Sequence, residues 1–274
     1  MNLVWAALIV IVTTAITVTS MLLVRRRAPE GSYFSDGDRA SGVFGVLATG
    51  FSVLLAFIIF LAFESYDASR SGAESEATIV AQQVQTAQFL PAPADSELTG
   101  ELTCYARYVS GPEWDALAEN TLGDSLNPWG VRMFKTISSV TTSTDAEQSG
   151  YDRWMDQTAA REQARVDRVH GAEGIIPTPL WVALALISLV LFGYMLFFAD
   201  SAEGAVTQGL LMGTVTAVIT TLLLLLVFFD HPHGSGVGRL QPVAMERTLR
   251  LIDIQAEAAG VTVTPACDAD GNPS

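Results

Sequence analysis

Four apolar, uncharged runs are the feature that most constrains what this chain can fold into. They occupy residues 2–24, 42–63, 180–199 and 206–229. Each run is about 20 residues long, which is the length that an α-helix needs to cross the hydrocarbon core of a bilayer. The sequence therefore predicts an all-α membrane protein whose four transmembrane helices are arranged in two pairs.

The ends of these runs divide the chain into four parts. The first pair of spans takes residues 1–63 and the second pair takes residues 178–229. Residues 64–177, between the pairs, are polar and acidic, and the stretch is long enough to fold as a helical extramembrane domain. Residues 230–274 are expected to form a short helix, over 242–259, and a disordered tail, over 268–274.

Apolar residues in the polar domain recur every three or four positions, which is the spacing of helices that bury one face. The pattern predicts that span two continues as one long helix through Gly72 until Pro91, and that further helices cover 98–109, follow Pro128, and cover 151–169. Residues 141–149 are expected to form a polar loop. The charged residues of the helix over 151–169 are expected to face solvent, among them Arg161, Arg165 and Arg168.

Charge and motifs exclude several function classes. The formal net charge of -14 argues against a nucleic-acid partner. The four runs contain no Asp, Glu, Lys, Arg or His, and this argues against a proton-coupled pump, which needs such groups at depth. No P-loop, G-x-S-x-G or H-E-x-x-H motif is present, so we expect no enzyme activity and no cofactor.

The positions of the arginines predict which side of the membrane each segment of the chain faces. Arg25, Arg26 and Arg27 directly follow the first run, and arginines in a short loop are retained in the cytoplasm. The first run lacks a basic leader and a cleavage site, so it is expected to stay as an anchor. Both termini and the polar domain would then be extracytoplasmic. Arginines that flank the second pair of spans favour the opposite orientation, but charges on long segments count for less.

Cys104 and Cys267 lie on the same side of the membrane in either orientation. In an oxidising compartment they could form a disulfide, or they could be two separate thiols, because sequence alone does not give the distance between them.

Two lines of small residues have the spacing of helix-packing faces. One follows span two and the other begins span four with a G-x-x-x-G pair: Gly42, Gly45, Thr49, Ser52 and Ala56, then Gly209 and Gly213. Small side chains let helices approach closely, either within one subunit or between subunits around a pore. Phe51, Phe57 and Phe60 are candidates for a hydrophobic constriction in such a pore. The alternative is that these phenylalanines face lipid.

Polar residues gather where spans two and four end at the same membrane face. Glu64 and Asp67 follow span two, and Asp230, His231 and His233 follow span four. Carboxylates and imidazoles together are typical ligands of divalent metals, so these five residues are a candidate metal site. The alternative is an interfacial turn that caps the helix.

Several of these segments resemble the bestrophin-like domain family, bacterial membrane proteins of unknown function named for their likeness to bestrophin anion channels. The likeness covers about residues 40–255. It rests on Gly45-Val46-Leu47, on Phe63-Glu64-Ser65-Tyr66-Asp67-Ala68, on Pro179-Leu180-Trp181 and on Asp230-His231-Pro232; His233-Gly234 depart from the family's pattern. The resemblance implies a four-span subunit in a bacterial plasma membrane and a ring of subunits in which span two lines an anion pore. Bestrophins place their large domain in the cytoplasm, opposite to the orientation that the arginines predict.

Two functions are compatible with these observations. The first is a non-catalytic scaffold or accessory subunit that uses its polar domain to dock a membrane-protein partner. The alternative is a homo-oligomeric, bestrophin-like ion channel. Besides the lipid bilayer, the expected partner is thus a second membrane protein or further copies of this chain.

Overall fold

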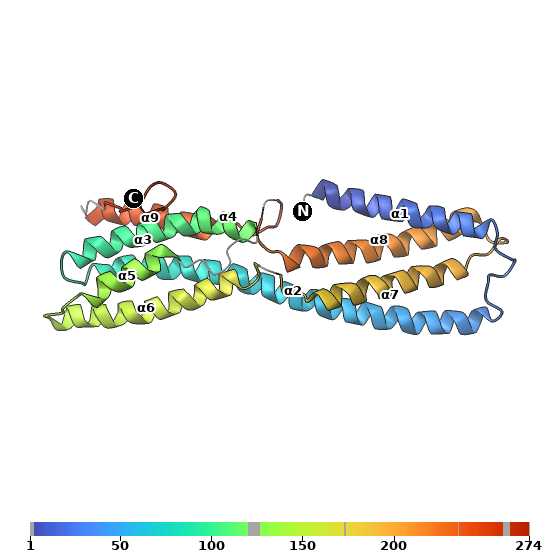
Figure 1. The fold of residues 1–274 in the computed structure, drawn as a ribbon, viewed down its shortest axis with the longest axis horizontal. Helices are drawn as coiled ribbons and strands as arrows, with labels where there is room; N and C mark the ends of the chain where they lie inside the picture. Colours follow the sequence, from blue (N-terminus) through green and yellow to red (C-terminus); the bar gives the residue numbers. More distant parts are fainter. Residues whose placement is uncertain (1–2, 120–126, 173, 235, 260–263, 274) are drawn as a thin grey trace. The chain divides into compact units, whose positions relative to one another are not determined.

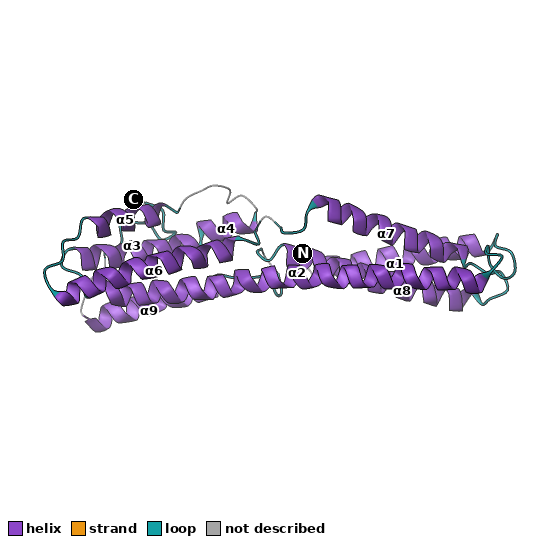
Figure 2. Cartoon of the chain, turned by 90° about the horizontal axis from the view of Figure 1, so that it is seen from below, coloured by secondary structure: helices purple, strands orange, loops and turns teal. Residues whose placement is uncertain are grey.

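The computed structural model describes residues 3–119, 127–172, 174–234, 236–259 and 264–273. The described residues form nine α-helices, with two isolated β-bridges and no strand. They divide into two compact units (Figures 1 and 2). The spanning unit comprises Met1–Ser65, Gly174–His231 and Ser235–Val237, and the polar unit comprises Tyr66–Glu173, Pro232–Gly234 and Gly238–Ser274.

The spanning unit holds α1 (Leu3–Arg25), the first half of α2 (Gly37–Ala87), α7 (Thr178–Phe197) and α8 (Ala205–Asp230). All four helices are long and apolar enough to cross a membrane. α1 lies beside α8 (Figure 1). α2, α7 and α8 share a core that includes Leu55, Leu184 and Leu226. The prediction of an all-α, four-span membrane protein is confirmed.

The polar unit is built from the second half of α2 together with five further helices. These are α3 (Ala94–Ser110), α4 (Pro112–Ala118), α5 (Pro128–Ser138), α6 (Asp145–Val169) and α9 (Val243–Ala259). α3 packs against α4, α5 and α9. The core contains the two most fully buried tryptophans, Trp129 and Trp154, next to Val80, Leu98 and Tyr105.

Gly72 lies inside the continuous helix α2, at a close contact with α6. A Cβ atom at Gly72 would lie 2.5 Å from the backbone nitrogen of Arg168 and 2.8 Å from the carbonyl oxygen of Ala164. Glycine lowers helix propensity by about 1 kcal/mol, and the close packing of α6 explains why it is nevertheless used here.

One local prediction was wrong in a way that capping explains. The loop expected over 141–149 is shorter, because α6 begins at Asp145 with a capping box formed by Thr144 and Glu147. The short helix α4 was not predicted, and it begins at Pro112, directly after the end of α3. Proline suits the first helical position, where its missing N–H costs nothing.

The tail expected to be disordered is packed onto the polar unit over the described residues 264–273. Cys104 and Cys267 form a disulfide, with their Cα atoms 5.8 Å apart. The indole Nε1–H of Trp129 donates to the carbonyl oxygen of Gly271 at 2.6 Å. The carboxylate of Asp268 accepts from the backbone N–H of Asn272 at 2.8 Å. These bonds compensate for the lack of apolar residues in this segment.

Candidate functional site

The small residues of span two face away from the core of their own subunit. Gly42, Gly45, Thr49, Ser52 and Ala56 are all exposed on the spanning unit. No atom lies within 4 Å of a Cβ built at Gly42 or Gly45. The core side of α2 is formed instead by larger residues, such as Phe51, Leu55 and Ile58. Packing within one subunit therefore does not explain this stripe.

The small residues of span four behave differently, because they pack against α1. A Cβ at Gly213 would lie 3.2 Å from a methyl group of Val18, and a Cβ at Gly209 would lie 3.5 Å from the same residue. Nearby, the hydroxyls of Thr17 and Thr216 hydrogen-bond at 2.9 Å. This contact is the close approach that a G-x-x-x-G pair permits. The two stripes thus differ: the one on α8 packs within the subunit, and the one on α2 is exposed.

Within the apolar run over 42–63, the exposed face of α2 is apolar apart from small hydroxyls. The hydroxyl of Ser52 donates to the carbonyl oxygen of Ala48 at 2.8 Å, within its own helix. Phe57 and Phe60 are 60% and 54% exposed, whereas Phe51, the third candidate for a constriction, is buried in the core of its own subunit. A face of this kind can contact the same face of a neighbouring subunit, and large aromatics within it can narrow a water-filled passage.

The candidate metal site receives no support. Among the described residues, no group of three or more His, Cys, Asp or Glu side chains lies close enough together to hold a metal ion. Asp230 has another role, since its carboxylate accepts the backbone N–H groups of Ile175 and Ile176 at 2.8 and 3.0 Å. The imidazole of His231 is 3.6 Å from the same carboxylate. Asp230 thereby fixes the segment that leads into α7.

His233 is buried in the polar unit, and Glu64 and Asp67 are exposed. The ring of His233 packs edge-on against the indole of Trp114, with centroids 5.3 Å apart. Burial lowers the pKa of His233 to about 4, and the positive charges of Arg168 and Arg239 act in the same direction. Its imidazole is therefore neutral at physiological pH.

A buried ion-pair network in the polar unit was missed by the sequence analysis, which expected its arginines in solvent. Arg168 is fully buried and binds two carboxylates, with Nε 2.5 Å from Glu76 and Nη2 2.7 Å from Glu113. Glu113 also accepts from Nε of Arg165 at 3.0 Å, and Glu76 accepts from the hydroxyl of Tyr105 at 2.5 Å. The network joins α2, α3, α4 and α6.

Burial disfavours the charged forms of these side chains, and the opposite charges of their partners offset this effect. Burial alone would raise the pKa of Glu113, but the nearby guanidiniums of Arg168 and Arg165 outweigh it, so the pKa lies below its usual range. Burial opposes the charge on Arg168, whereas Glu76 and Glu113 raise its pKa beyond the ordinary value. Glu113 and Arg168 are therefore both ionised at neutral pH.

Arg161, also expected in solvent, is buried next to this network. Its Nη1 donates to the side-chain carbonyl of Gln83 at 2.9 Å, and its guanidinium lies 4.8 Å from the ring centroid of Tyr105. A signal was present in the sequence. Arg161, Ala164 and Arg168 follow the three- and four-residue spacing of the buried positions Trp154 and Gln157 on α6.

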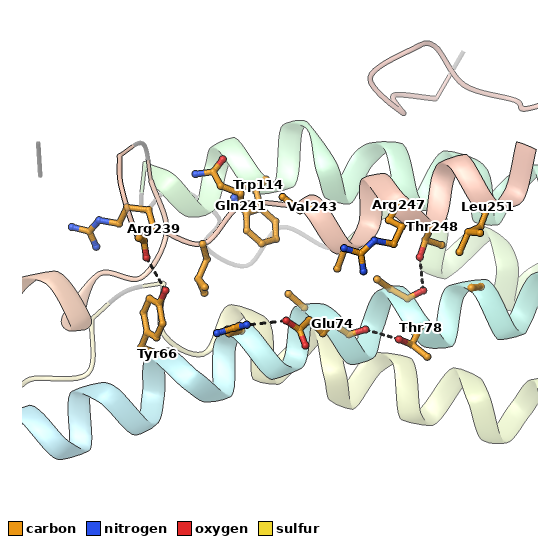
Figure 3. Close-up of a pocket in the computed structure, with 17 residues that line it drawn as sticks. Tyr66, Glu74, Thr78, Trp114, Arg239, Gln241, Val243, Arg247, Thr248 and Leu251 are labelled. Atoms are coloured by element: carbon orange, nitrogen blue, oxygen red, sulfur yellow. Dashed lines mark hydrogen bonds and ion pairs between the residues drawn. The ribbon is translucent and has the colours of Figure 1, made fainter.

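The polar unit also contains a groove of about 700 Å³ between α2 on one side and α9, with the segment that leads into it, on the other (Figure 3). The hydroxyl of Tyr66 donates to the carbonyl oxygen of Gly238 at 2.7 Å at one end. The hydroxyl of Thr248 donates to the carbonyl oxygen of Ala77 at 2.9 Å farther along. These two bonds attach the walls of the groove to each other.

Comparison with known proteins places this architecture in a family. The model of the Bestrophin-like domain matches residues 11–245. No curated protein matches the sequence.

Solved structures of several membrane proteins share the fold. A variant of a membrane protein has a TM-score of 0.67 at 12% identity, over 95% of this chain and 100% of that chain. A variant of a bacterial bestrophin homologue from Klebsiella pneumoniae has a TM-score of 0.65 at 13% identity, over 91% of this chain and 98% of that chain. A second variant of that homologue has a TM-score of 0.62 at 13% identity, over 93% and 98%.

At these identities the solved structures establish likeness of fold alone, whereas the family model matches the sequence itself over most of its length. The resemblance carried by span two, by Pro179-Leu180-Trp181 and by Asp230-His231-Pro232 is confirmed. This membrane protein belongs to the Bestrophin-like domain family.

Proposed function

We propose that this chain assembles with copies of itself into an ion channel, with the small-residue face of α2 lining the pore. The observation that carries the proposal is the exposure of Gly42, Gly45, Thr49, Ser52 and Ala56 on the isolated subunit. An uncovered stripe of small residues on a membrane helix is suited to close contact between subunits. The family assignment favours this alternative over the scaffold that the sequence analysis placed first.

The uncharged, partly aromatic surface of this α2 face supports a pore that closes where it is narrow and where water is excluded from it. The stripe has no charged side chain, and Phe57 and Phe60 lie on the exposed side of α2 near the end of its apolar run. Hydrophobic constrictions can close a pore by excluding water.

Cysteine accessibility tests which helix lines the pore. The chain has two cysteines and both are in the disulfide, so an introduced cysteine is the only free thiol. For Ser52→Cys, we expect a charged thiosulfonate reagent added to the aqueous phase to change the conductance of reconstituted protein. Leu189→Cys is the matched control, because Leu189 is 68% exposed on α7. Equal responses of the two variants would contradict a pore lined by α2.

A non-conducting scaffold predicts a different result. Purification in mild detergent would then yield a second membrane protein in fixed stoichiometry, and reconstituted Ser52→Cys would show no current to modify. A homo-oligomer that conducts without any partner excludes the scaffold.

We further propose that the polar unit and both termini are extracytoplasmic. Two observations support this orientation: the arginines at 25–27, and the Cys104–Cys267 disulfide, which needs an oxidising compartment to persist. In intact cells, a membrane-impermeant maleimide should label Ser143→Cys, in the exposed turn before α6, and should not label Ser201→Cys, in the turn between α7 and α8. The reverse labelling pattern would place the polar unit in the cytoplasm.

A further inference from the structure

The C-terminal segment over 264–273, here called the strap, lies along one face of α3. A Cβ atom at Gly100 would lie 3.3 Å from a backbone oxygen of the strap, and a Cβ at Gly111 would lie 3.9 Å from another. Between these two points the disulfide joins Cys104 to Cys267. Gly100, Cys104 and Gly111 follow helical spacing, so they share one face of α3, and the strap covers that face.

Hydrogen bonds from two side chains attach the strap to the helices beneath it. The indole Nε1–H of Trp129 donates to the carbonyl oxygen of Gly271 at 2.6 Å, and the guanidinium of Arg107 donates to the carbonyl oxygen of Asp268 at 3.3 Å. Other hydrogen bonds of the strap are internal, such as the one from the backbone N–H of Asp270 to the carboxylate of Asp268 at 3.0 Å. Internal bonds shape the strap but do not hold it on α3.

The strap buries little apolar surface. Cys267 packs against the core of the polar unit, whereas Ala266 and Ala269 are exposed. The net stabilisation from one hydrogen bond is similar in size to the entropic cost of ordering one residue, and the strap has ten residues. Without its covalent link, we therefore expect the strap to leave α3.

The two sulfurs of the disulfide have different surroundings. Cys104 is fully buried, and Cys267 is partly exposed. Nη1 of Arg107 lies 3.9 Å from Sγ of Cys267. A cation beside a sulfur stabilises its thiolate, and a stabilised thiolate leaves more readily in thiol–disulfide exchange. Cys267 is thus the sulfur that an external thiol can attack first and displace last.

We propose that the Cys104–Cys267 disulfide is a redox-controlled latch. A dithiol reductant opens the latch and releases the strap from α3, while the helices of the polar unit stay folded. Release uncovers the face of α3 around Gly100 and Gly111 and frees the indole N–H of Trp129. The latch belongs to the polar unit alone and does not depend on whether the protein conducts ions.

The exchange is balanced in atoms and electrons. A thiolate of the dithiol attacks Sγ of Cys267, the bond between the two cysteines breaks, and the sulfur of Cys104 leaves as a thiolate that takes up a proton. The second thiol of the reductant then attacks the reductant's sulfur in the mixed disulfide, and Cys267 leaves beside Arg107. The protein gains two electrons and two protons, which the dithiol loses as it becomes a disulfide.

Reduction under native conditions is the first test. The full-length protein in detergent is incubated with dithiothreitol, its thiols are trapped by alkylation, and the intact mass counts them. The chain has two cysteines, so complete reduction adds two labels. We expect complete reduction without denaturant. A disulfide that opens only after the protein is unfolded would be purely structural, and this result would overturn the proposal.

The indole N–H resonances of 15N-labelled protein then report whether the strap leaves. We expect reduction to shift the resonance of Trp129, because its N–H loses the carbonyl oxygen of Gly271, and to leave that of Trp154 unchanged. Trp154 is the internal control, since it is buried in the same core on α6. Trp129→Phe and Trp154→Phe assign the two resonances. An unchanged Trp129 resonance would contradict release, and a shift of both would show that the disulfide holds the whole polar unit together, which also contradicts the latch.

A variant without the disulfide separates release from other effects of the reductant. Cys104→Ser combined with Cys267→Ser should give the Trp129 resonance of the reduced wild-type protein, and dithiothreitol should not change it further. If this double variant instead shows the resonance of the oxidised wild-type protein, the strap stays on α3 without its covalent link and the proposal fails.

The role of Arg107 is tested by the rate of reduction. Arg107→Gln should slow reduction by dithiothreitol about threefold, because the thiolate of Cys267 loses its neighbouring positive charge. Arg153→Gln, at an exposed position of α6, is the matched control and should react at the wild-type rate. Equal rates for the two variants would overturn the role assigned to Arg107.

Discussion

Arg168 determines the electrostatics of the polar unit at the scale of single residues. Its guanidinium is fully buried between Glu76 and Glu113, which come from α2 and α4. A buried ion pair adds little net stability compared with well-packed apolar residues, but removal of one partner leaves an uncompensated charge in the interior. The network therefore specifies how these helices pack more than it adds to their stability.

Arg168→Met should destabilise the protein by about 3–5 kcal/mol, because two buried carboxylates lose their shared counter-charge. The thermal unfolding midpoint of the purified protein measures this effect. Arg153→Gln, at an exposed position of the same helix, should leave the midpoint within the experimental error. An Arg168→Met midpoint equal to that of Arg153→Gln would show that the carboxylates are stabilised by other means.

His233 gives the protein a defined dependence on pH. Its pKa is about 4 in the folded state, against 6.5 for an ordinary histidine, because the ring is buried and lies near Arg168 and Arg239. Between pH 6.5 and 4 the unfolded chain binds a proton that the folded state does not. The stability contribution is thus complete above pH 6.5 and is lost on acidification, by up to about 3 kcal/mol.

We expect the unfolding midpoint of the wild-type protein to fall between pH 7 and pH 5, and His233→Gln to reduce that fall. His170→Gln is the control at an exposed histidine and should keep the wild-type dependence. This window lies above the titration range of Glu113, whose pKa is held low. A fall of equal size in His233→Gln would assign the pH dependence to other groups.

At the scale of elements, α2 is the part that the sequence predicts best. Its apolar run and the regular spacing from Ala73 to Ala87 predict one helix that leaves the membrane and continues into the polar unit, and α2 is continuous over 51 residues. Periodicity succeeds here because one face of the helix is buried over most of its length. α6 was also placed correctly, but its buried arginines were not, because charged residues are almost never buried unless they are paired and the partners lie far away in sequence.

Gly72 tests how closely α2 and α6 must pack. Gly72→Ala should destabilise the polar unit by about 1–3 kcal/mol, since the new methyl group would overlap the backbone of α6. Gly193→Ala in α7 is the matched control, because a Cβ there meets nothing within 4 Å. Thermal unfolding compares the two variants. If Gly72→Ala is as stable as Gly193→Ala, α6 can shift at no cost.

The tail shows where sequence reasoning fails at this scale. The composition of residues 268–274 is polar and short of apolar residues, and this is typical of disorder. Residues 264–273 are ordered by a disulfide and by hydrogen bonds from the side chains of Trp129 and of Arg107 in α3. These partners lie more than a hundred residues away in sequence. Long-range bonds of this kind leave no local pattern to detect.

At the scale of the whole molecule, the two stripes of small residues show what one subunit can and cannot explain. Both stripes follow helical steps of three or four residues, so the sequence left open whether they pack inside the subunit or between subunits. In the structure, Gly209 and Gly213 pack against α1, and the stripe of α2 is exposed.

The five residues of the predicted metal site were grouped because they follow the ends of two spans. A place at the end of a span does not fix the distances between side chains, and among the described residues no group of three or more His, Cys, Asp or Glu could hold a metal ion.

An uncovered α2 stripe predicts that the purified protein is a homo-oligomer. Light scattering in detergent should give a protein mass that is an integer multiple, above one, of 29.3 kDa. Gly45→Leu should weaken assembly, because bulky side chains keep helices apart where small residues allow contact. Leu189→Ala, on the exposed side of α7, should leave the mass unchanged. A monomeric wild-type protein would contradict the proposed contact.

The most direct test of the channel proposal is single-channel recording from the purified protein in planar bilayers. The account predicts unitary currents that are absent from empty membranes and that a charged thiol reagent alters in Ser52→Cys but not in Leu189→Cys. No current above that of empty membranes, across several salts and both polarities of voltage, would contradict it.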